Sequence, residues 1–238
     1  MTTTGLLLTW ARCSDPGARA EWEAWWDDTH LADVAEIVGA TRATRWALTT
    51  SGAAHHAGIG FTHVAMYELD DVGGFAVERA LDALARRWSQ LWAEGKVHPR
   101  HVLAGVDALI GHGPSGWHPQ PTAALTGRIV AFILCTDPAK GDEWDAWYDA
   151  EHLPDMMETG AFAAGSRWRR VRPGSFAPRF ATLYDVAGMT VDEAVTISGE
   201  AMPKLVAAGR KPSWHAGGLT VILEPVGSHG PAGWHAEA

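Results

Sequence analysis

Two thirteen-residue stretches place tryptophan, carboxylate and histidine side chains in the same order. EWEAWWDDTHLAD occupies residues 21–33 and EWDAWYDAEHLPD occupies residues 143–155, and eight of the thirteen positions are identical. Residues four apart share one face of an α-helix. Each stretch therefore predicts a helix with an aromatic stripe that ends in an imidazole: Trp22, Trp26 and His30 in the first copy, and Trp144, Tyr148 and His152 in the second.

The histidines of the two stretches, His30 and His152, are the predicted catalytic groups. Pro154 follows His152 closely, and a residue before proline avoids the α conformation, so the helix is expected to end near His152 or Leu153. The negative end of the helix dipole would then favour the imidazolium form and raise the pKa of the histidine. An imidazole in such a place can act as a general acid or base near neutral pH.

Carboxylates flank both histidines at helical spacing. Asp27 and Asp149 lie three residues before the histidine of their stretch, and Asp33 and Asp155 lie three residues after it. Such a carboxylate would hold one ring nitrogen and fix the tautomer, which leaves the other nitrogen to accept a proton. We therefore predict catalytic roles for Asp27 and Asp149. The alternative is structural, with the imidazole ending the helix by pairing with backbone groups or an aspartate.

Further polar candidates lie on predicted strands. Tyr67 and Tyr184 occupy matching strands and are predicted to donate a proton or a hydrogen bond, the alternative being a packed aromatic side chain. Arg45–Trp46 is repeated as Arg167–Trp168, and neighbouring strand residues face opposite sides of a sheet. The sequence leaves open which member of each pair faces the space between the sheets. An arginine there would bind a substrate carboxylate or enolate.

The repeat extends through the whole chain. HGPSGWH at residues 112–118 returns as HGPAGWH at residues 229–235, so two units are predicted at residues 1–120 and 121–238. Apolar runs, amphipathic stretches and turn residues give each unit the order strand, helix, strand, strand, helix, strand. This is the ferredoxin-like βαββαβ plan of an α+β protein. Helices cover one sheet face, and packing the two sheets together would bury the other.

Composition narrows the function classes. The net charge of −9 disfavours nucleic acid and anionic membranes as partners. No apolar run is long enough for a membrane span, no signal peptide is recognised, and the two cysteines have no metal-type spacing, so a cytoplasmic protein is expected. No phosphate loop, GxSxG or CxxC motif is present, which argues against nucleotide-binding and serine-hydrolase sites.

The motif EWDAWYDAEHLPD, with SRW after it, resembles the W-x-x-WYD-x-EHLPD signature of the dimeric α/β-barrel superfamily in its EthD-like branch. The match covers both units but is looser in the first, where Thr29 and Ala32 replace the acidic residue and the proline. The resemblance implies two ferredoxin-like units packed sheet to sheet as one barrel that encloses a cavity, here within one chain. Members include monooxygenases, isomerases, cyclases, decarboxylases and dehydratases. Distant members bind haem.

Together these features predict a cofactor-independent lyase, isomerase or cyclase that uses histidine acid–base catalysis on a small apolar cyclic or polyketide-like substrate. A cofactor-free monooxygenase and a non-catalytic ligand-binding protein are the alternatives. No metal is expected, and haem is the only cofactor considered, with His215 as a conceivable axial ligand. The partner is a small-molecule substrate, and a homodimer of tandem barrels is considered. The predicted substrate-binding residues are Trp22, Trp26, Trp144, Tyr148, Arg167 and Arg45.

Overall fold

The fold was analysed in a computed structural model of the 238-residue chain. The structure describes residues 5–55, 58–70, 75–112, 124–172 and 178–229. The boundary predicted between residues 120 and 121 therefore lies outside the described residues.

The first half of the chain supplies four strands and their covering helices. In chain order its elements are β1 (Gly5–Cys13), α1 (Arg19–Trp25), a π-helical turn (Trp26–His30), α2 (Leu31–Val38), β2 (Arg42–Leu48), α3 (Thr50–His55), β3 (His63–Leu69), α4 (Phe75–Ala93) and β4 (His101–Gly111). A short 3₁₀ turn precedes α1. The sequence predicts strands at residues 5–13 and 101–111, and the structure confirms both ends of each, whereas α3 is not predicted.

The second half follows the same order. Its elements are β5 (Leu125–Cys135), α5 (Gly141–Trp147), a π-helical turn (Tyr148–His152), α6 (Leu153–Glu158), β6 (Ala164–Arg170), β7 (Phe180–Ala187), α7 (Val191–Ala207) and β8 (His215–His229). A 3₁₀ turn precedes α5 as well. Thr190 as N-cap with Glu193 three residues later predicts the start of α7, and the structure confirms it, because the two residues form a capping box that satisfies free amide groups of the first turn.

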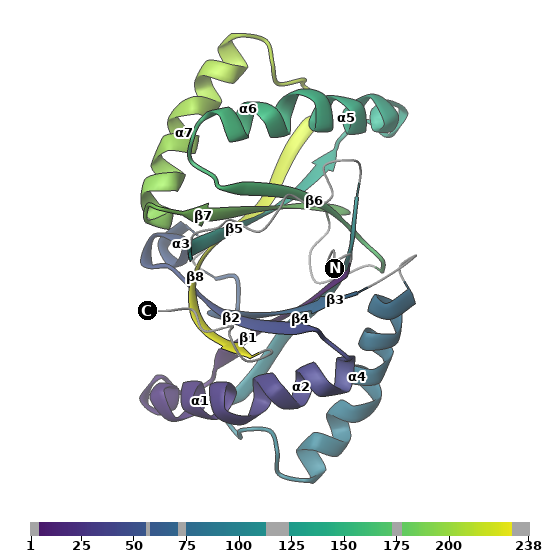
Figure 1. Cartoon of the computed structure of the whole chain (residues 1–238), viewed down its shortest axis with the longest axis vertical. Coiled ribbons are helices and arrows are strands. Elements are labelled where there is room, and N and C mark those ends of the chain that lie inside the picture. The colour runs from purple at the N-terminus through teal and green to yellow at the C-terminus, as the bar shows by residue number, and fades with distance from the viewer. Residues whose placement is uncertain (1–4, 56–57, 71–74, 113–123, 173–177, 230–238) are drawn as a thin grey trace.

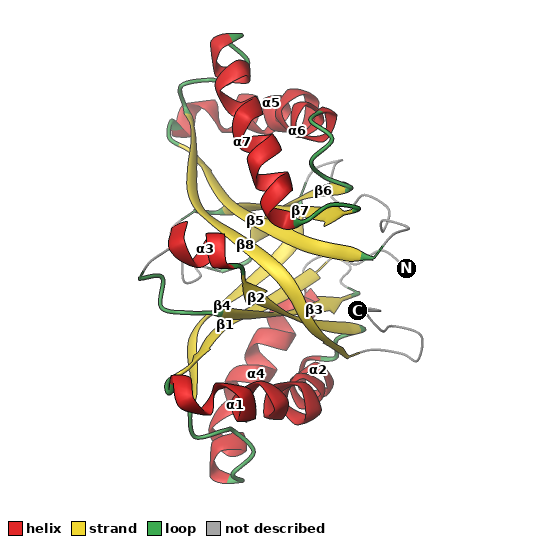
Figure 2. Ribbon diagram, turned by 90° about the vertical axis from the view of Figure 1, so that its left-hand side faces the viewer, coloured by secondary structure: helices red, strands yellow, loops and turns green. Residues whose placement is uncertain are grey.

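The eight strands form one closed antiparallel barrel in the order β1-β3-β2-β8-β5-β7-β6-β4. The strands of each half stay together, and the halves meet at two seams, β2 with β8 and β4 with β6. Figures 1 and 2 show α1, α2 and α4 on one outer side of this barrel and α5, α6 and α7 on the opposite side. The predicted α+β barrel is thereby confirmed. Closure leaves no unpaired edge strand in the barrel, which removes a route to aggregation.

The interior of the barrel is packed with side chains. Leu6 and Leu8 of β1 belong to a core cluster that draws on both halves and includes Trp46 and Trp168, whereas the intervening Leu7 packs with the helices. This alternation assigns one face of each strand to the barrel interior and the other to a helix layer. Among the described residues, large apolar side chains therefore line the space between the sheets, where the family resemblance implied a cavity.

Ion pairs are buried among these apolar residues. Asp107 of β4 is fully buried and lies 3.0 Å from Nε of Arg170 on β6, while Trp10 Nε1 donates to its other oxygen at 2.8 Å. Arg128 lies 2.5 Å from Asp185 and stacks over Trp46. Because Asp107 and Arg170 come from different halves, this pair ties the β4–β6 seam together.

None of the helices that the structure describes is long and apolar enough to cross a membrane. Cys13 and Cys135 are free thiols at matching strand ends, and each Sγ contacts the carbonyl oxygen of the aspartate two residues on.

The Asp107–Arg170 pair gives a stability prediction. Replacing Arg170 by Met should lower the free energy of unfolding by about 3–5 kcal/mol, because it leaves a buried carboxylate without its counter-charge. The double variant Asp107→Asn/Arg170→Met should recover much of that loss, since the amide keeps the acceptor for Trp10. Urea unfolding of both variants measures the difference. Equal losses in the two would show that lost packing, rather than the unpaired charge, is responsible.

Candidate functional site

Each half holds a pair of imidazoles between its helix layer and its sheet. We call His30 and His101 the first imidazole pair, with ring centroids 5.1 Å apart, and His152 and His215 the second imidazole pair, at 5.4 Å. All four side chains are buried. The structure thus places the predicted His30 and His152 in enclosed layers, each beside a second histidine.

A π-helical turn carries the first histidine of each pair. The amide of Leu31 bonds to the carbonyl of Trp26, and that of Leu153 to the carbonyl of Tyr148, so each bond spans five residues. The expected helix end at His152 is wrong, because the helix continues through Pro154 to Glu158. Both halves have this turn although only the second has the proline, so proline does not cause it. Such turns recur at functional sites.

The second histidine of each pair begins the last strand of its half and accepts a hydrogen bond from a helix tryptophan. Trp22 Nε1 donates to His101 Nδ1 at 3.2 Å, and Trp144 Nε1 donates to His215 Nδ1 at 3.1 Å. Because an indole N–H can only donate, Nδ1 must be unprotonated and the neutral ring carries its proton on Nε2. Each of these imidazoles is therefore held as an N–H donor.

Burial keeps the imidazoles neutral. It lowers the pKa of His30 to about 3, with a further contribution from His101, and the pKa of His101 to about 4. Burial likewise lowers the pKa of His152 to about 4 and that of His215 to about 3. The expected rise in pKa at a helix end is wrong, since the rings lie within the helix layer, where desolvation outweighs any dipole effect.

The aspartates predicted to orient the histidines bind arginines instead. Asp27 makes a bidentate ion pair with Arg45, at 2.7 and 2.5 Å. Asp149 lies 2.9 Å from Arg167, which also binds Asp145 at 2.7 Å. The predicted orienting role of Asp27 and Asp149 is therefore corrected. A planar guanidinium forks across both carboxylate oxygens, which an imidazole nitrogen cannot do.

These ion pairs also show which way the strand residues face. Arg45 and Arg167 face the helix layers, and Trp46 and Trp168 face the barrel interior. Arg167 lies over the ring of Tyr148, with 4.6 Å between the guanidinium carbon and the ring centroid. Both arginines thus lie on the same side of the sheet as the imidazole pairs, with their charge already matched by aspartate.

The predicted tyrosines also lie in the helix layers. Tyr148 Oη lies 2.7 Å from Thr182 Oγ1 and 3.5 Å from Tyr184 Oη. Burial raises the pKa of both these phenols and that of Tyr67. At neutral pH they are hydrogen-bond donors, not bases.

The aromatic residues predicted to bind the substrate are close-packed. Trp22, Trp26, Trp144 and Tyr148 are each at most 1% exposed. Two further tryptophans stack on the imidazoles, Trp25 on His30 at 4.5 Å and Trp147 on His152 at 5.0 Å.

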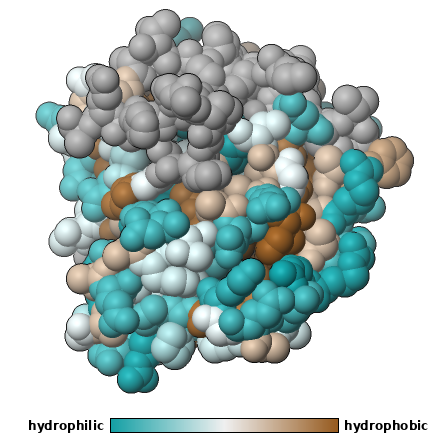
Figure 3. All heavy atoms as spheres, turned by 60° about the horizontal axis from the view of Figure 1, so that its bottom comes forward, coloured by the Kyte–Doolittle hydropathy of each residue, from teal (hydrophilic) through white to brown (hydrophobic). Residues whose placement is uncertain are grey.

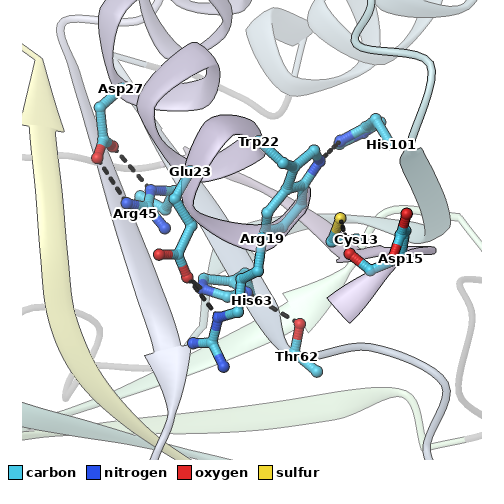
Figure 4. A network of polar contacts seen from close by, with 10 residues as sticks. All are labelled: Cys13, Asp15, Arg19, Trp22, Glu23, Asp27, Arg45, Thr62, His63 and His101. Carbon is cyan, nitrogen blue, oxygen red and sulfur yellow. Dashed lines mark hydrogen bonds and ion pairs between the residues drawn. The ribbon is translucent and has the colours of Figure 1, made fainter. Parts of the chain in front are cut away.

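A carboxylate–imidazole contact in the first half was missed by sequence reasoning (Figure 4). His63 Nε2 lies 3.1 Å from Glu23 Oε1, and its Nδ1 lies 2.9 Å from Thr62 Oγ1. Burial and the charge of Arg45 lower the pKa of His63 to about 4. The alternation of β3 was a usable signal, because His63 is four residues from Tyr67 and shares its sheet face. In the second half, Phe180 stands at the matching position.

His101 was missed as well, although His101 and His215 begin equivalent strands and the repeat could have shown the match.

Among the described residues, no group of three or more His, Cys, Asp or Glu side chains is arranged to hold a metal ion.

No family model matches the chain, and no curated protein matches its sequence. Solved structures match almost all of it. An anthrone oxidase-like protein has a TM-score of 0.54 at 14% identity over 100% of this chain and 97% of the other. A protein provisionally named a monooxygenase, from Fusobacterium nucleatum, has a TM-score of 0.54 at 8% identity over 97% and 96%. At such identities the likeness shows the shared dimeric α/β-barrel fold alone.

A heme-binding protein from Thermus thermophilus also shares the fold, with a TM-score of 0.54 at 9% identity over 95% and 92% of the two chains. The expectation that the protein works without a cofactor is corrected by this comparison. Haem needs an apolar cavity beside its axial ligand. It does not fit the described residues around either imidazole pair, because aromatic rings pack against all four imidazoles and neither described pocket is lined by histidine.

The neutral imidazoles predict an acid-sensitive fold. Their pKa values are lower in the folded than in the unfolded chain, so the unfolded chain binds more protons between about pH 6.5 and pH 4. The free energy of unfolding should therefore decrease as the pH is lowered through that window, by up to about 1.4 kcal/mol per pH unit per histidine. Urea unfolding at several pH values checks this. The His30→Gln variant should show a shallower slope, and an unchanged slope would contradict the assignment.

Proposed function

We propose that the protein is a small-molecule enzyme that removes a proton from a flat, largely apolar substrate with an acidic C–H or hydroxyl group. In this proposal His152 or its counterpart His30 accepts the proton. The Nε2–H group of His215 or His101 stabilises the negative oxygen that forms. The observation that supports this most strongly is the tryptophan-fixed tautomer, which presents an N–H donor beside a second neutral imidazole.

In the proposed proton transfer, groups of this chain hold and move the proton. The substrate proton moves to the imidazole lone pair, and the electron pair left behind delocalises onto a carbonyl oxygen as an enolate. That oxygen accepts a hydrogen bond from the neighbouring Nε2–H group. The free imidazole is a weak base because of its low pKa, but the enolate charge favours the imidazolium at the moment of transfer. General acid–base help of this kind contributes roughly 10²–10⁴-fold.

The enolate can then follow one of two routes. Return of the proton to another carbon makes the enzyme an isomerase, loss of a leaving group makes it a lyase, and aldol attack of the enolate carbon on a carbonyl group of the same substrate makes it a cyclase. Reaction with O₂ makes it a monooxygenase: a CH₂ group becomes C=O, and one oxygen atom leaves as water. The fold relatives named as monooxygenase and anthrone oxidase-like favour the second route by analogy. Oxygen consumption during turnover separates the routes.

We also propose that the chain is a tandem duplication of a ferredoxin-like unit of the EthD-like branch, with units at residues 1–120 and 121–238. The repeated motifs support this, as does the strand order, in which β4-β1-β3-β2 is followed by β8-β5-β7-β6. A cytoplasmic location and a homodimer of such barrels belong to the same proposal. Sedimentation at increasing protein concentration tests the dimer.

The direct test is hydrogen exchange into a substrate. Anthrone and a set of cyclic β-dicarbonyl compounds would be incubated with the protein in D₂O, and loss of the acidic C–H signal followed by NMR. Wild type should accelerate exchange for at least one compound. The His30→Ala/His152→Ala double variant should lose about 10²-fold or more of that acceleration.

Two controls make the outcome decisive. Glu151→Ala changes an exposed residue of the same π-helical turn and should leave exchange unchanged. Thermal unfolding of each variant checks that it is folded. Exchange that persists in a folded double variant contradicts the proposal, and so does a wild type that accelerates exchange for none of the compounds. Tight binding without exchange would instead indicate a ligand-binding protein.

A further inference from the structure

The two imidazole pairs are covered by equivalent helices with different side chains. α4 and α7 share a buried valine, a buried alanine three residues later, and a glycine after the last turn: Val77, Ala80 and Gly95 in the first half, and Val191, Ala194 and Gly209 in the second. This register aligns Leu84 with Ser198 and Trp88 with Met202. The helix over the second pair thus carries smaller or more polar residues at two positions that face the core.

In the first half, α4 closes over the imidazoles. The ring of Trp88 lies 5.9 Å from that of His30 and 5.8 Å from that of His101. Leu84 is buried one turn away, and α4 packs against α2. Figure 3, which brings the side of α1, α2 and α4 forward, shows a mostly hydrophilic surface there with small hydrophobic areas.

In the second half, a groove of about 380 Å³ lies between α6 and α7. Both helices lie on the same outer side of the barrel (Figures 1 and 2). Ile197, Ala201 and Leu205 of α7 supply apolar lining, and Leu205 also packs against the core cluster that contains Trp147. The volume lies in the range of small-molecule sites.

One lining residue of the groove lies close to the second imidazole pair: burial lowers the pKa of His152, and the charge of Asp155 acts to raise it. Asp155 lines the groove and lies three residues after His152, on the same side of the helix. Its carboxylate is held in a bidentate ion pair with Arg210. Glu158 and Glu200 add two further carboxylates to the lining, and Lys204 adds an ammonium group.

We infer that the α6–α7 groove admits the substrate to the second imidazole pair, and that Trp88 seals the first. The working site is therefore in the second half. That the molecule admitted is a substrate rests on the proposed function. The difference in access between the two imidazole pairs does not depend on catalytic activity.

Acylation of the histidines by diethyl pyrocarbonate tests the access directly. The reagent modifies unprotonated imidazole, and all four rings are neutral, so the rates near pH 7 report access rather than protonation. Peptide mass spectrometry separates the sites. His152 and His215 should react about tenfold faster than His30 and His101, since each ~1.4 kcal/mol of local opening slows access tenfold.

A matched pair of variants completes the test. Met202→Trp should slow labelling of the second pair towards the rate of the first, and Trp88→Met should accelerate labelling of the first. Both variants are checked by thermal unfolding, and labelling of the remaining histidines serves as an internal reference. Equal rates for the two pairs in wild type overturn the inference, as does a folded Met202→Trp variant that labels like wild type.

Discussion

The hydrogen bond from a helix indole to a strand imidazole organises both halves of the molecule. It joins the Trp-rich helix to the first residue of the last strand, Trp22 to His101 and Trp144 to His215. Because the indole can only donate, it also selects the neutral tautomer with its proton on Nε2. Burial then keeps that imidazole neutral. The position of His30 or His152 beside a neutral N–H donor follows from this one contact.

Side chains alternate along the strands, so the polar groups of the candidate sites face the helix layers and the packing residues face the barrel interior. Arg167 faces the helix layer and is neutralised by Asp145 and Asp149, while its neighbour Trp168 packs inside the barrel. The interior holds large apolar side chains and matched ion pairs such as Asp107–Arg170. A packed interior resists deformation. The barrel is therefore a rigid base on which the two helix layers hold their polar groups.

Both halves share this arrangement, but the residues that surround the imidazole pairs differ. Tyr148 of the second half finds a hydroxyl partner in Thr182, whereas Trp26 at the matching place has its N–H buried with no hydrogen-bond partner among the described residues. His63, with its Glu23 contact, is matched by Phe180. The indole–imidazole bond is common to both halves, so the differences alter surroundings and access while the central geometry stays.

Much of the architecture could be predicted from the sequence, because the patterns that indicate strands and helix ends are local. A short apolar run located β1, the Thr190–Glu193 spacing located the start of α7, and the repeat placed His30 and His152 in equivalent positions. Other features depend on partners far along the chain. The helix continues through Pro154 into α6, and Asp149 binds Arg167 instead of the nearby histidine. The sequence by itself determined the elements and the repeated motif. Only tertiary packing decided protonation, ion pairing and access, since each depends on which distant groups share a buried space.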